Sequence, residues 1–314
     1  MNAKNPNRST KVARTPQPAR SDSAPEREIQ GVYPAPGLHW VGDGFRVAGY
    51  FSSIPDVVEK LSPFLLLDYH PSYTYPATHE RRGVGPHPHR GFETVTLAWQ
   101  GSVAHHDSTG RGGVIGPGDV QWMTAASGIL HKEYHDASYA RQGGPFQMAQ
   151  LWVNLPRAHK TSPPGYQGIV ADQMGSVTLP NDSGLVRVIA GEYQGAKGPA
   201  KTFTPINLFD VRLNRNGKVD FSFPAHQNTA LLLMEGEVSI NGKTKATTND
   251  FVLFQNVGER ISIEAESEAH VLVLNGEPID EPVVQYGPFV MNTEREIHEA
   301  ISDFNRGKFG HLED

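Results

Sequence analysis

Apolar residues come in short runs separated by Gly, Pro, Asn and Asp from about residue 30 onward. The runs are rich in β-branched and aromatic side chains, which is the pattern of β-strands. Strands are therefore expected at residues 64–69, 94–99, 120–124, 146–153, 208–213, 229–234, 251–254 and 270–274. Many short strands with regular turn signals are typical of a sandwich or a barrel, so the pattern predicts an all-β fold.

A helical period is found near the C-terminus. Ile297, Ala300, Ile301 and Phe304 recur at spacings of three and four residues, behind a capping residue at 292 or 293. This spacing predicts an amphipathic helix over residues 292–304, with a shorter helical turn at 54–61.

The two halves of the chain resemble each other. A strand that ends in Trp-Gln-Gly-Ser-Val at 99–103 is followed by Pro-Gly-Asp-Val-Gln-Trp at 117–122. In the second half, Met-Glu-Gly-Glu-Val at 234–238 is followed by Asn-Asp-Phe-Val-Leu-Phe at 249–254. The repeat predicts a duplicated β-barrel, with residues 30–160 forming the first barrel and residues 161–314 forming the second barrel and its terminal helix.

Composition and charge exclude some kinds of site and disfavour some kinds of partner. The 314 residues are enough for two domains. The absence of cysteine excludes disulfide frameworks and thiolate metal sites, so any metal must be bound by His, Asp or Glu. The net charge is −6, with +5 on residues 1–21 and −11 on the remainder. We expect residues 1–29 to be a disordered basic tail, and direct nucleic-acid binding is disfavoured by the acidic body.

Targeting signals are weak. Pro16 and Pro18 interrupt any amphipathic transit helix, and no apolar stretch has the length of a signal sequence core or a membrane span. A cytoplasmic protein without a membrane partner is expected.

Eight of the 14 histidines fall between His70 and His135. Two pairs in this window have i,i+2 spacing, namely His87 with His89 and His131 with Glu133, and in a strand such residues project from one face. A single His-x-His is common in exposed loops, but two such pairs on adjacent strands would converge three imidazoles and one carboxylate. That donor set suits Fe(II), Mn(II), Ni(II), Cu(II) or Zn(II).

Side chains alternate between the two faces of the strand after His89, and this alternation predicts which way the Glu93 side chain points. Odd positions give Glu93, Val95, Leu97 and Trp99, and this face is predicted to line the barrel interior. Glu93 would then be a fifth ligand or, as we favour, a hydrogen-bond acceptor for a ligand imidazole. His135 lies too far along its strand to share an ion with His131.

The remaining histidines carry weaker signals. His105 and His106 are interpreted as polar lining or surface residues, and isolated histidines of the second half, such as His226 and His270, are interpreted as structural.

Four segments together resemble the pirin family of bicupins. They are His-Pro-His-Arg-Gly-Phe-Glu-Thr-Val at 87–95, Pro-Gly-Asp-Val-Gln-Trp-Met-Thr-Ala at 117–125, Gly-Ile-Leu-His-Lys-Glu at 128–133 and Gln-Leu-Trp-Val-Asn-Leu-Pro at 150–156. The resemblance extends from about Val41 to residues 287–292 and the C-terminal helix.

The resemblance implies two stacked cupin barrels with one metal, usually iron, in the N-terminal barrel. The ligands it implies are His87, His89, His131 and Glu133. Lys132 departs from the family, which often has a small residue there. The second half has neither His-x-His nor His-x-Glu, which implies a barrel without metal.

The resemblance also implies an activity similar to quercetin 2,3-dioxygenase, in which a flavonol is cleaved with O2 and carbon monoxide is released. Glu133 or Glu93 would take the proton of the substrate hydroxyl. Phe92, Trp122 and Met123 are candidates for the pocket wall, although a core position is the favoured interpretation of each. The alternatives are a metal-binding transcriptional co-regulator that acts through a protein partner, and a cupin isomerase or sugar-binding protein.

Overall fold

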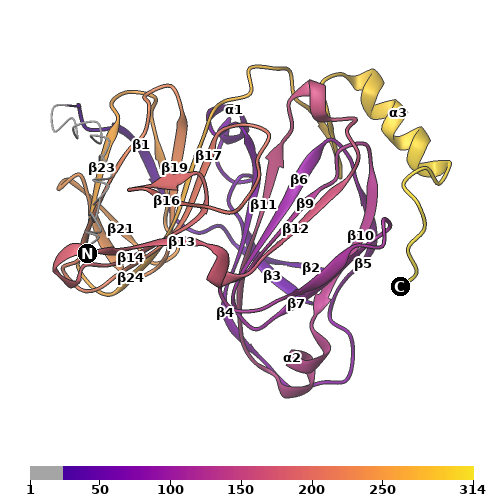
Figure 1. Cartoon of the computed structure of the whole chain (residues 1–314), viewed down its shortest axis with the longest axis horizontal. Coiled ribbons are helices and arrows are strands. Elements are labelled where there is room, and N and C mark those ends of the chain that lie inside the picture. Colours follow the sequence, from indigo (N-terminus) through magenta and orange to yellow (C-terminus); the bar gives the residue numbers. More distant parts are fainter. Residues whose placement is uncertain (1–23) are drawn as a thin grey trace, which may run out of the picture.

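The computed structural model describes residues 24–314 and shows two β-barrels side by side (Figure 1). Each barrel packs a seven-stranded sheet against a four-stranded sheet, with antiparallel neighbours. The predicted all-β architecture of two stacked barrels is confirmed. Residues 1–23 of the predicted basic tail lie outside the described residues.

The first barrel contains the histidine-rich part of the sequence. Its seven-stranded sheet comprises, in spatial order, β12 (Gly165–Ile169), β9 (Val120–Thr124), β6 (Phe92–Gln100), β11 (Gly144–Asn154), β4 (Phe64–Tyr75), β3 (Phe45–Gly49) and β2 (Leu38–Val41). Its four-stranded sheet comprises β5 (Gly83–His89), β10 (Ile129–His135), β7 (Val103–Asp107) and β8 (Gly112–Ile115).

The second barrel repeats this order strand for strand. Its seven-stranded sheet comprises β1 (Ile29–Tyr33), β22 (Phe251–Phe254), β19 (Asn228–Glu235), β24 (Ala269–Gly276), β17 (Ile206–Leu213), β14 (Gly184–Ala190) and β13 (Gly175–Leu179). Its four-stranded sheet comprises β18 (Lys218–Ser222), β23 (Arg260–Ala265), β20 (Glu237–Ile240) and β21 (Thr244–Thr247). Gly101 and Gly236, both at positive φ, make equivalent turns after β6 and β19, which confirms the duplication seen in the sequence.

Two small two-stranded sheets complete the β structure. They are the hairpin of β15 (Glu192–Tyr193) with β16 (Ala196–Lys197), and the pair of β25 (Val284–Tyr286) with β26 (Phe289–Met291). The eight strands predicted from the sequence are all present, as β4, β6, β9, β11, β17, β19, β22 and β24.

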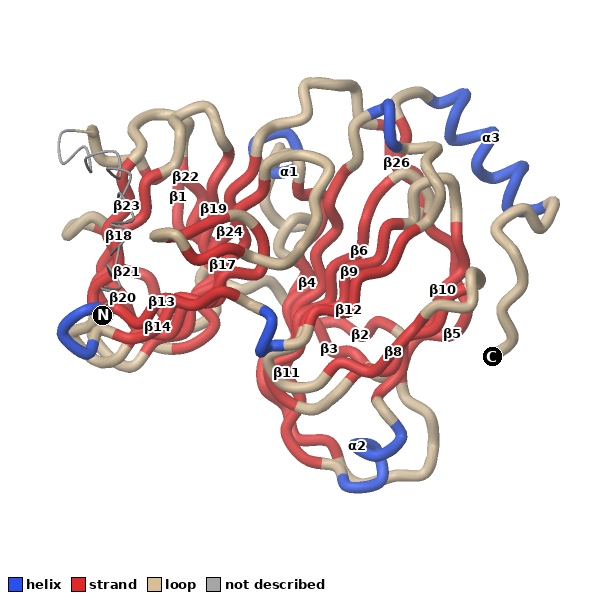
Figure 2. Tube along the Cα trace, in the orientation of Figure 1, coloured by secondary structure: helices blue, strands red, loops and turns tan. Residues whose placement is uncertain are grey.

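Helices are short and lie outside the barrels (Figure 2). They are α1 (Val57–Lys60), α2 (Ala137–Gln142), α3 (Glu294–Asn305) and three 3₁₀ turns at Arg157–His159, Ala171–Gln173 and Pro180–Asp182. The predicted C-terminal helix is α3, and the Thr293 hydroxyl caps it by accepting from the Glu296 amide. No helix in the described part of the chain is long and apolar enough to cross a membrane.

Both ends of the described chain, and one strand from its middle, cross between the barrels. Strand β1 pairs with β22 of the second barrel, and the buried Arg27 guanidinium donates to the carbonyls of Gly258, Gln227 and Pro224 there. In the other direction, β12 pairs with β9 of the first barrel.

The C-terminal segment lies against the first barrel as well. The Val290 amide donates to the Arg90 carbonyl, and the Arg90 guanidinium pairs with Asp303 of α3 at 2.9 Å. Hydrogen bonding thus crosses the predicted domain limits, 30–160 and 161–314, at each of these contacts. The limits themselves stay a prediction.

The largest apolar core lies between the two seven-stranded sheets. Val95, Leu97 and Trp99 of β6 pack there with residues of the second barrel such as Leu232 and Leu274. The prediction that odd positions of this strand line the barrel interior was therefore wrong. The turn at Arg90 and Gly91 separates β5 from β6 and interrupts the parity, because Gly91 has φ of 90°.

Candidate metal centre

Three imidazoles converge inside the first barrel. His87 and His89 lie on β5, and His131 lies opposite His87 on β10. The ring centroids are 4.2 Å apart for His87 and His131, 4.7 Å for His89 and His131, and 4.9 Å for His87 and His89. One ring nitrogen of each lies within 4.8 Å of those of the other two. The i,i+2 spacing therefore brings the three imidazoles together as expected, whereas the fourth expected donor, Glu133, lies outside this group.

The nitrogens of this group have unused coordination capacity. Among the described residues, both ring nitrogens of His89 and Nε2 of His131 are buried without a hydrogen-bond partner. Nδ1 of His87 lies 2.8 Å from the Gly85 carbonyl oxygen, which fixes this nitrogen as the donor and leaves Nε2 for a ligand. A buried polar atom without a partner costs about 1–3 kcal/mol, a cost that a bound cation would remove. The residues present thus fit a metal ion.

The charge state of the imidazoles also suits a metal. Burial, and after it the neighbouring imidazoles, hold the pKa of His89 and of His131 well below the usual histidine value. Neutral imidazole is the form that coordinates a metal.

Glu133 is buried on the same face of β10 as His131 and is held by three donors of the seven-stranded sheet. Its Oε1 accepts from the Thr96 hydroxyl at 3.0 Å and from the Gln121 amide at 3.3 Å. Its Oε2 accepts from the Gln150 amide at 2.8 Å. These bonds orient the carboxylate in the barrel interior.

The four predicted ligands fall into two overlapping groups. Glu133 gathers with His131 and His105 within 4.8 Å, whereas His87 and His89 gather with His131. His131 is common to both groups, so it is the centre of the cluster.

His105 also lies in the cluster, as a buried polar lining residue that was not among the four predicted ligands. It is fully buried on β7, with Nδ1 2.9 Å from the Gln121 amide nitrogen and 3.3 Å from Nδ1 of His131. Its Nε2 lies 3.8 Å from the Asp107 carboxylate. His105 and Asp107 form a third i,i+2 pair, a signal that is visible in the sequence. His106, which lies between them, is exposed, as expected.

Glu93 does not face the imidazoles. It lies on the opposite face of β6 from Thr94 and Thr96, where it accepts from the Thr124 hydroxyl at 2.7 Å. Burial raises its pKa to about 7 against the opposing effect of this hydrogen bond. The roles considered for Glu93, as ligand, imidazole acceptor or base, are not supported, because they followed from the wrong parity of β6.

Aromatic rings form one wall beside His89. The rings of Phe92 and Trp152 lie 5.0 Å and 5.3 Å from it, and 4.3 Å from each other. Trp122 lies in the core between the barrels, and Met123 is buried in an apolar cluster. The core interpretation of Trp122, Met123 and Phe92 is confirmed, and the buried Phe92 ring also contacts His89.

Two other histidines have structural partners, as expected. His135 Nε2 lies 2.9 Å from the Gly44 carbonyl oxygen, and its ring stacks on Phe146. His270 is hydrogen-bonded to Asp210, which also accepts from the Trp99 indole of the first barrel.

Comparison with known proteins places the chain in a family. Residues 44–153 match the family described as Pirin, and residues 208–310 match the Pirin C-terminal cupin domain. A Pseudomonas aeruginosa protein named "Putative quercetin 2,3-dioxygenase" is 46% identical over 283 residues, which cover 90% of this chain and 98% of that protein. The chain belongs to the pirin family.

Other pirins and a solved structure agree with this assignment. Rat Pirin is 37% identical over 264 residues, covering 81% of this chain and 84% of the rat protein. The crystal structure of quercetin 2,3-dioxygenase from Acinetobacter baumannii superimposes with a TM-score of 0.88 at 46% identity, over 92% of this chain and all of that one. The two barrels are therefore the cupin barrels of a pirin.

Proposed function

We propose that this pirin is a metal-dependent dioxygenase that cleaves a flavonol such as quercetin with O2 and releases carbon monoxide. The observation that carries the proposal is the set of buried, unpartnered ring nitrogens of His89 and His131 beside His87, next to an aromatic wall. The names of the P. aeruginosa and A. baumannii relatives support the reaction class.

The proposed metal ligands are His87, His89, His131 and Glu133. Three imidazoles and one carboxylate are a nitrogen and oxygen donor set, for which we propose Fe(II), with Mn, Ni, Cu or Zn as alternatives. Such a metal would lower the pKa of a bound substrate hydroxyl and supply the chemistry that activates O2.

Glu133 is the proposed general base for the substrate hydroxyl, a role that requires its carboxylate to loosen from the metal. Its Oε1 accepts from two donors, whereas Oε2 accepts from the Gln150 amide alone. Oε2 therefore has the greater remaining capacity to accept a proton. Thr96, Gln121 and Gln150 keep the carboxylate in one orientation, which is the requirement for efficient proton transfer.

The aromatic wall is proposed to select the substrate. Trp152, partly exposed beside His89 and supported by the buried Phe92 ring, offers apolar ring surface on which a planar flavonol can pack. The same rings exclude water from the reacting atoms.

Metal analysis followed by turnover on the same sample tests the proposal. We expect one equivalent of metal per chain, with O2 consumption and carbon monoxide release when quercetin is added. His89→Ala should lose both metal and activity, whereas His226→Ala, at an exposed histidine of the second barrel, should lose neither.

Two results would contradict the proposal. Stoichiometric metal in His89→Ala would disprove the ligand assignment. The protein could also bind each of Fe, Mn, Ni, Cu and Zn and show no turnover with any of them. That result would disprove the dioxygenase activity and favour a regulatory protein that acts through a partner.

A further inference from the structure

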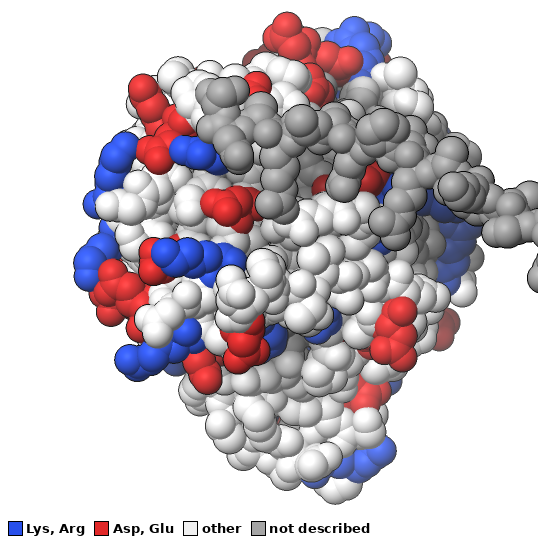
Figure 3. Space-filling view, turned by 60° about the vertical axis from the view of Figure 1, so that its left-hand side comes forward, with Lys and Arg blue, Asp and Glu red and all other residues white. Residues whose placement is uncertain are grey.

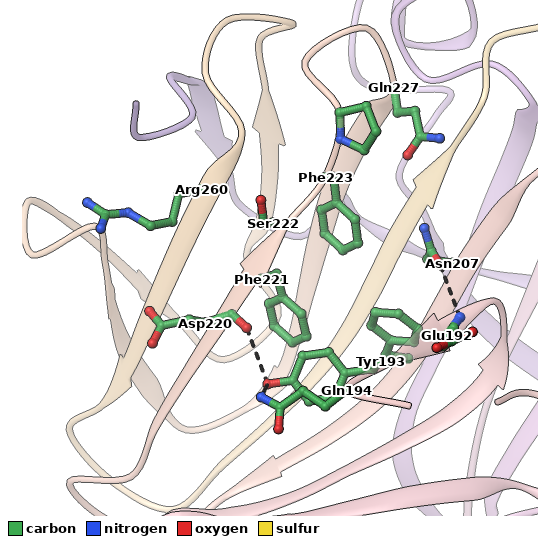
Figure 4. A pocket seen from close by; sticks show the side chains of 12 residues that line it. Glu192, Tyr193, Gln194, Asn207, Asp220, Phe221, Ser222, Phe223, Gln227 and Arg260 are labelled. Atoms are coloured by element: carbon green, nitrogen blue, oxygen red, sulfur yellow. Dashed lines mark hydrogen bonds between the residues drawn. The ribbon is translucent and has the colours of Figure 1, made fainter. Parts of the chain in front are cut away.

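A cavity of about 450 Å³ opens at the side of the second barrel, between β18 and the hairpin of β15 and β16 (Figure 4). This volume lies in the usual range for small-molecule sites. Strand β18 holds the place in its sheet that β5, with His87 and His89, holds in the first barrel. The cavity is therefore the counterpart of the candidate metal centre, in a barrel with different side chains.

The inner surface of the cavity is aromatic. Phe209, Phe221, Phe223 and Tyr193 line it, and all four are buried. The rings of Phe221 and Phe223 are 5.9 Å apart and inclined by only 6°, and that of Phe209 is inclined by 27° to Phe221 at 5.8 Å. Ring faces of this kind bind planar aromatic groups by offset stacking or edge contacts.

One polar group at the cavity lacks a partner. Gln227 is 8% exposed, and among the described residues its Oε1 is buried without a hydrogen bond. Its Nε2 donates to the Glu277 carboxylate at 3.2 Å, which fixes the orientation of the amide. Figure 4 shows the oxygen on the side of the phenyl rings and the nitrogen turned away. An occupant with a hydrogen-bond donor would satisfy this oxygen.

The rim of the cavity disfavours anions. Glu192 pairs with Lys197 and Arg260 pairs with Glu26, each at 3.6 Å. Asp220 is exposed and, within the described residues, has no ion-pair partner. Acidic and basic side chains are interspersed over this side of the molecule, as Figure 3 shows. Among the described residues, the rim thus offers no unpaired cation to an anion, and the Asp220 carboxylate points away from the phenyl rings (Figure 4).

We propose that this cavity binds a small, planar, uncharged aromatic molecule that carries a hydroxyl donor, at a site separate from the metal centre. The aromatic surface supplies stacking area, Gln227 accepts the hydroxyl hydrogen, and the lining cation Arg260 is already paired with Glu26, so an anion gains no partner there. The proposal does not depend on the dioxygenase activity.

Fluorescence titration with three naphthalenes tests the proposal on the full-length protein. 2-Naphthol is a neutral planar donor at pH 7, because phenolic pKa values lie near 10. 2-Methoxynaphthalene lacks the donor, and 2-naphthoate is an anion. We expect saturable 1:1 binding of 2-naphthol, at least tenfold tighter than that of either analogue, and equal in metal-loaded and EDTA-treated protein.

Two exposed positions of β18 provide a matched pair of variants. Ser222 lines the cavity and Lys218 does not. Ser222→Trp should block the mouth and weaken 2-naphthol binding at least tenfold, whereas Lys218→Trp should leave it within twofold. Gln227→Leu should abolish the preference for 2-naphthol over the methyl ether, with circular dichroism as the check on folding.

Three outcomes would overturn the proposal. One is the absence of saturable binding. Another is binding that Ser222→Trp does not weaken, or that EDTA treatment abolishes, because either would place the ligand in the first barrel. The last is equal affinity for the three naphthalenes, which would remove the role of Gln227 and show that the cavity does not discriminate against anions.

Discussion

The two barrels share one strand order but have opposite interiors. In the first barrel, the facing inner residues of β5 and β10 include His87 opposite His131. In the second barrel, β18 and β23 place Val219 opposite Ile263, and Phe221 opposite Ile261. A few inner positions therefore decide whether this barrel can hold a cation, while the strand order stays the same.

The seven-stranded sheets differ in the same way. Gln150 faces Thr96 across β11 and β6, and both support Glu133. At the corresponding positions of the second barrel, Val273 faces Leu231, and both belong to its apolar core. The first barrel therefore has oriented polar side chains at positions where the second barrel has buried apolar ones.

The largest effect on stability is expected when a polar side chain of the first barrel's interior is introduced at the corresponding position of the second barrel. Val273→Gln places an amide in an apolar core without partners and adds volume to a packed site. The free energy of unfolding should fall by about 3–5 kcal/mol, measured by urea denaturation. Val283→Gln, at a partly exposed valine, is the control and should change stability by less than about 0.5 kcal/mol. A similar loss in both variants would contradict the assignment of Val273 to the core.

The next largest difference between the two barrels is expected in their hydrogen exchange when the metal is removed. A ligand that binds the folded protein stabilises it by about 3–4 kcal/mol at free concentrations of 100 to 1,000 times Kd. Metal loading should therefore slow hydrogen exchange in β5 and β10, with little change in β18 and β23. Exchange measured by mass spectrometry checks this, and uniform protection of both barrels would argue against a site confined to the first. His89→Ala should show no metal-dependent protection.

A smaller effect is expected from the buried carboxyl of Glu93, whose counterpart in the second barrel is the neutral Asn228. Burial raises the Glu93 pKa from about 4.5 to about 7, so the folded state binds more protons than the unfolded state between these values. This contribution to stability is fully present below pH 4.5 and is lost as the pH rises through 7. The difference amounts to roughly 3 kcal/mol at most.

Glu93→Gln tests this prediction because it keeps the shape and removes the charge. Its free energy of unfolding should decline less than that of the wild type between pH 5 and pH 8. Parallel pH profiles of the two proteins would show that Glu93 titrates normally in the folded state.

The smallest effect is expected at Lys132, which lies between two proposed ligands. Its ammonium points away from the barrel interior and donates to the Glu313 carbonyl. Lys132→Ala should leave metal affinity within twofold, measured by competition with a chelator. A tenfold change would mean that the outer face of β10 influences the metal centre.

Local patterns predicted the strands and the histidine pairs well, because strand length and i,i+2 spacing are local properties. They failed for β6. Its odd-numbered side chains pack on the other barrel and its even-numbered side chains line the interior of its own barrel. Apolar residues therefore occur on both faces, and their pattern does not show which face is inside. Local patterns also could not show that β1 pairs with β22, because pairing between segments far apart in the chain leaves no local signal.

The crossing of the chain ends between the barrels has a consequence for protein synthesis. Strand β1 is among the first described segments to leave the ribosome, yet its partner β22 is complete only when residue 254 has been made. The first barrel is translated before the second, but the segment that covers it, with Val290 and Asp303, emerges last. The first barrel therefore cannot reach its final form during translation of its own half of the gene, and strand β1 must wait for its partner until most of the second half has been made.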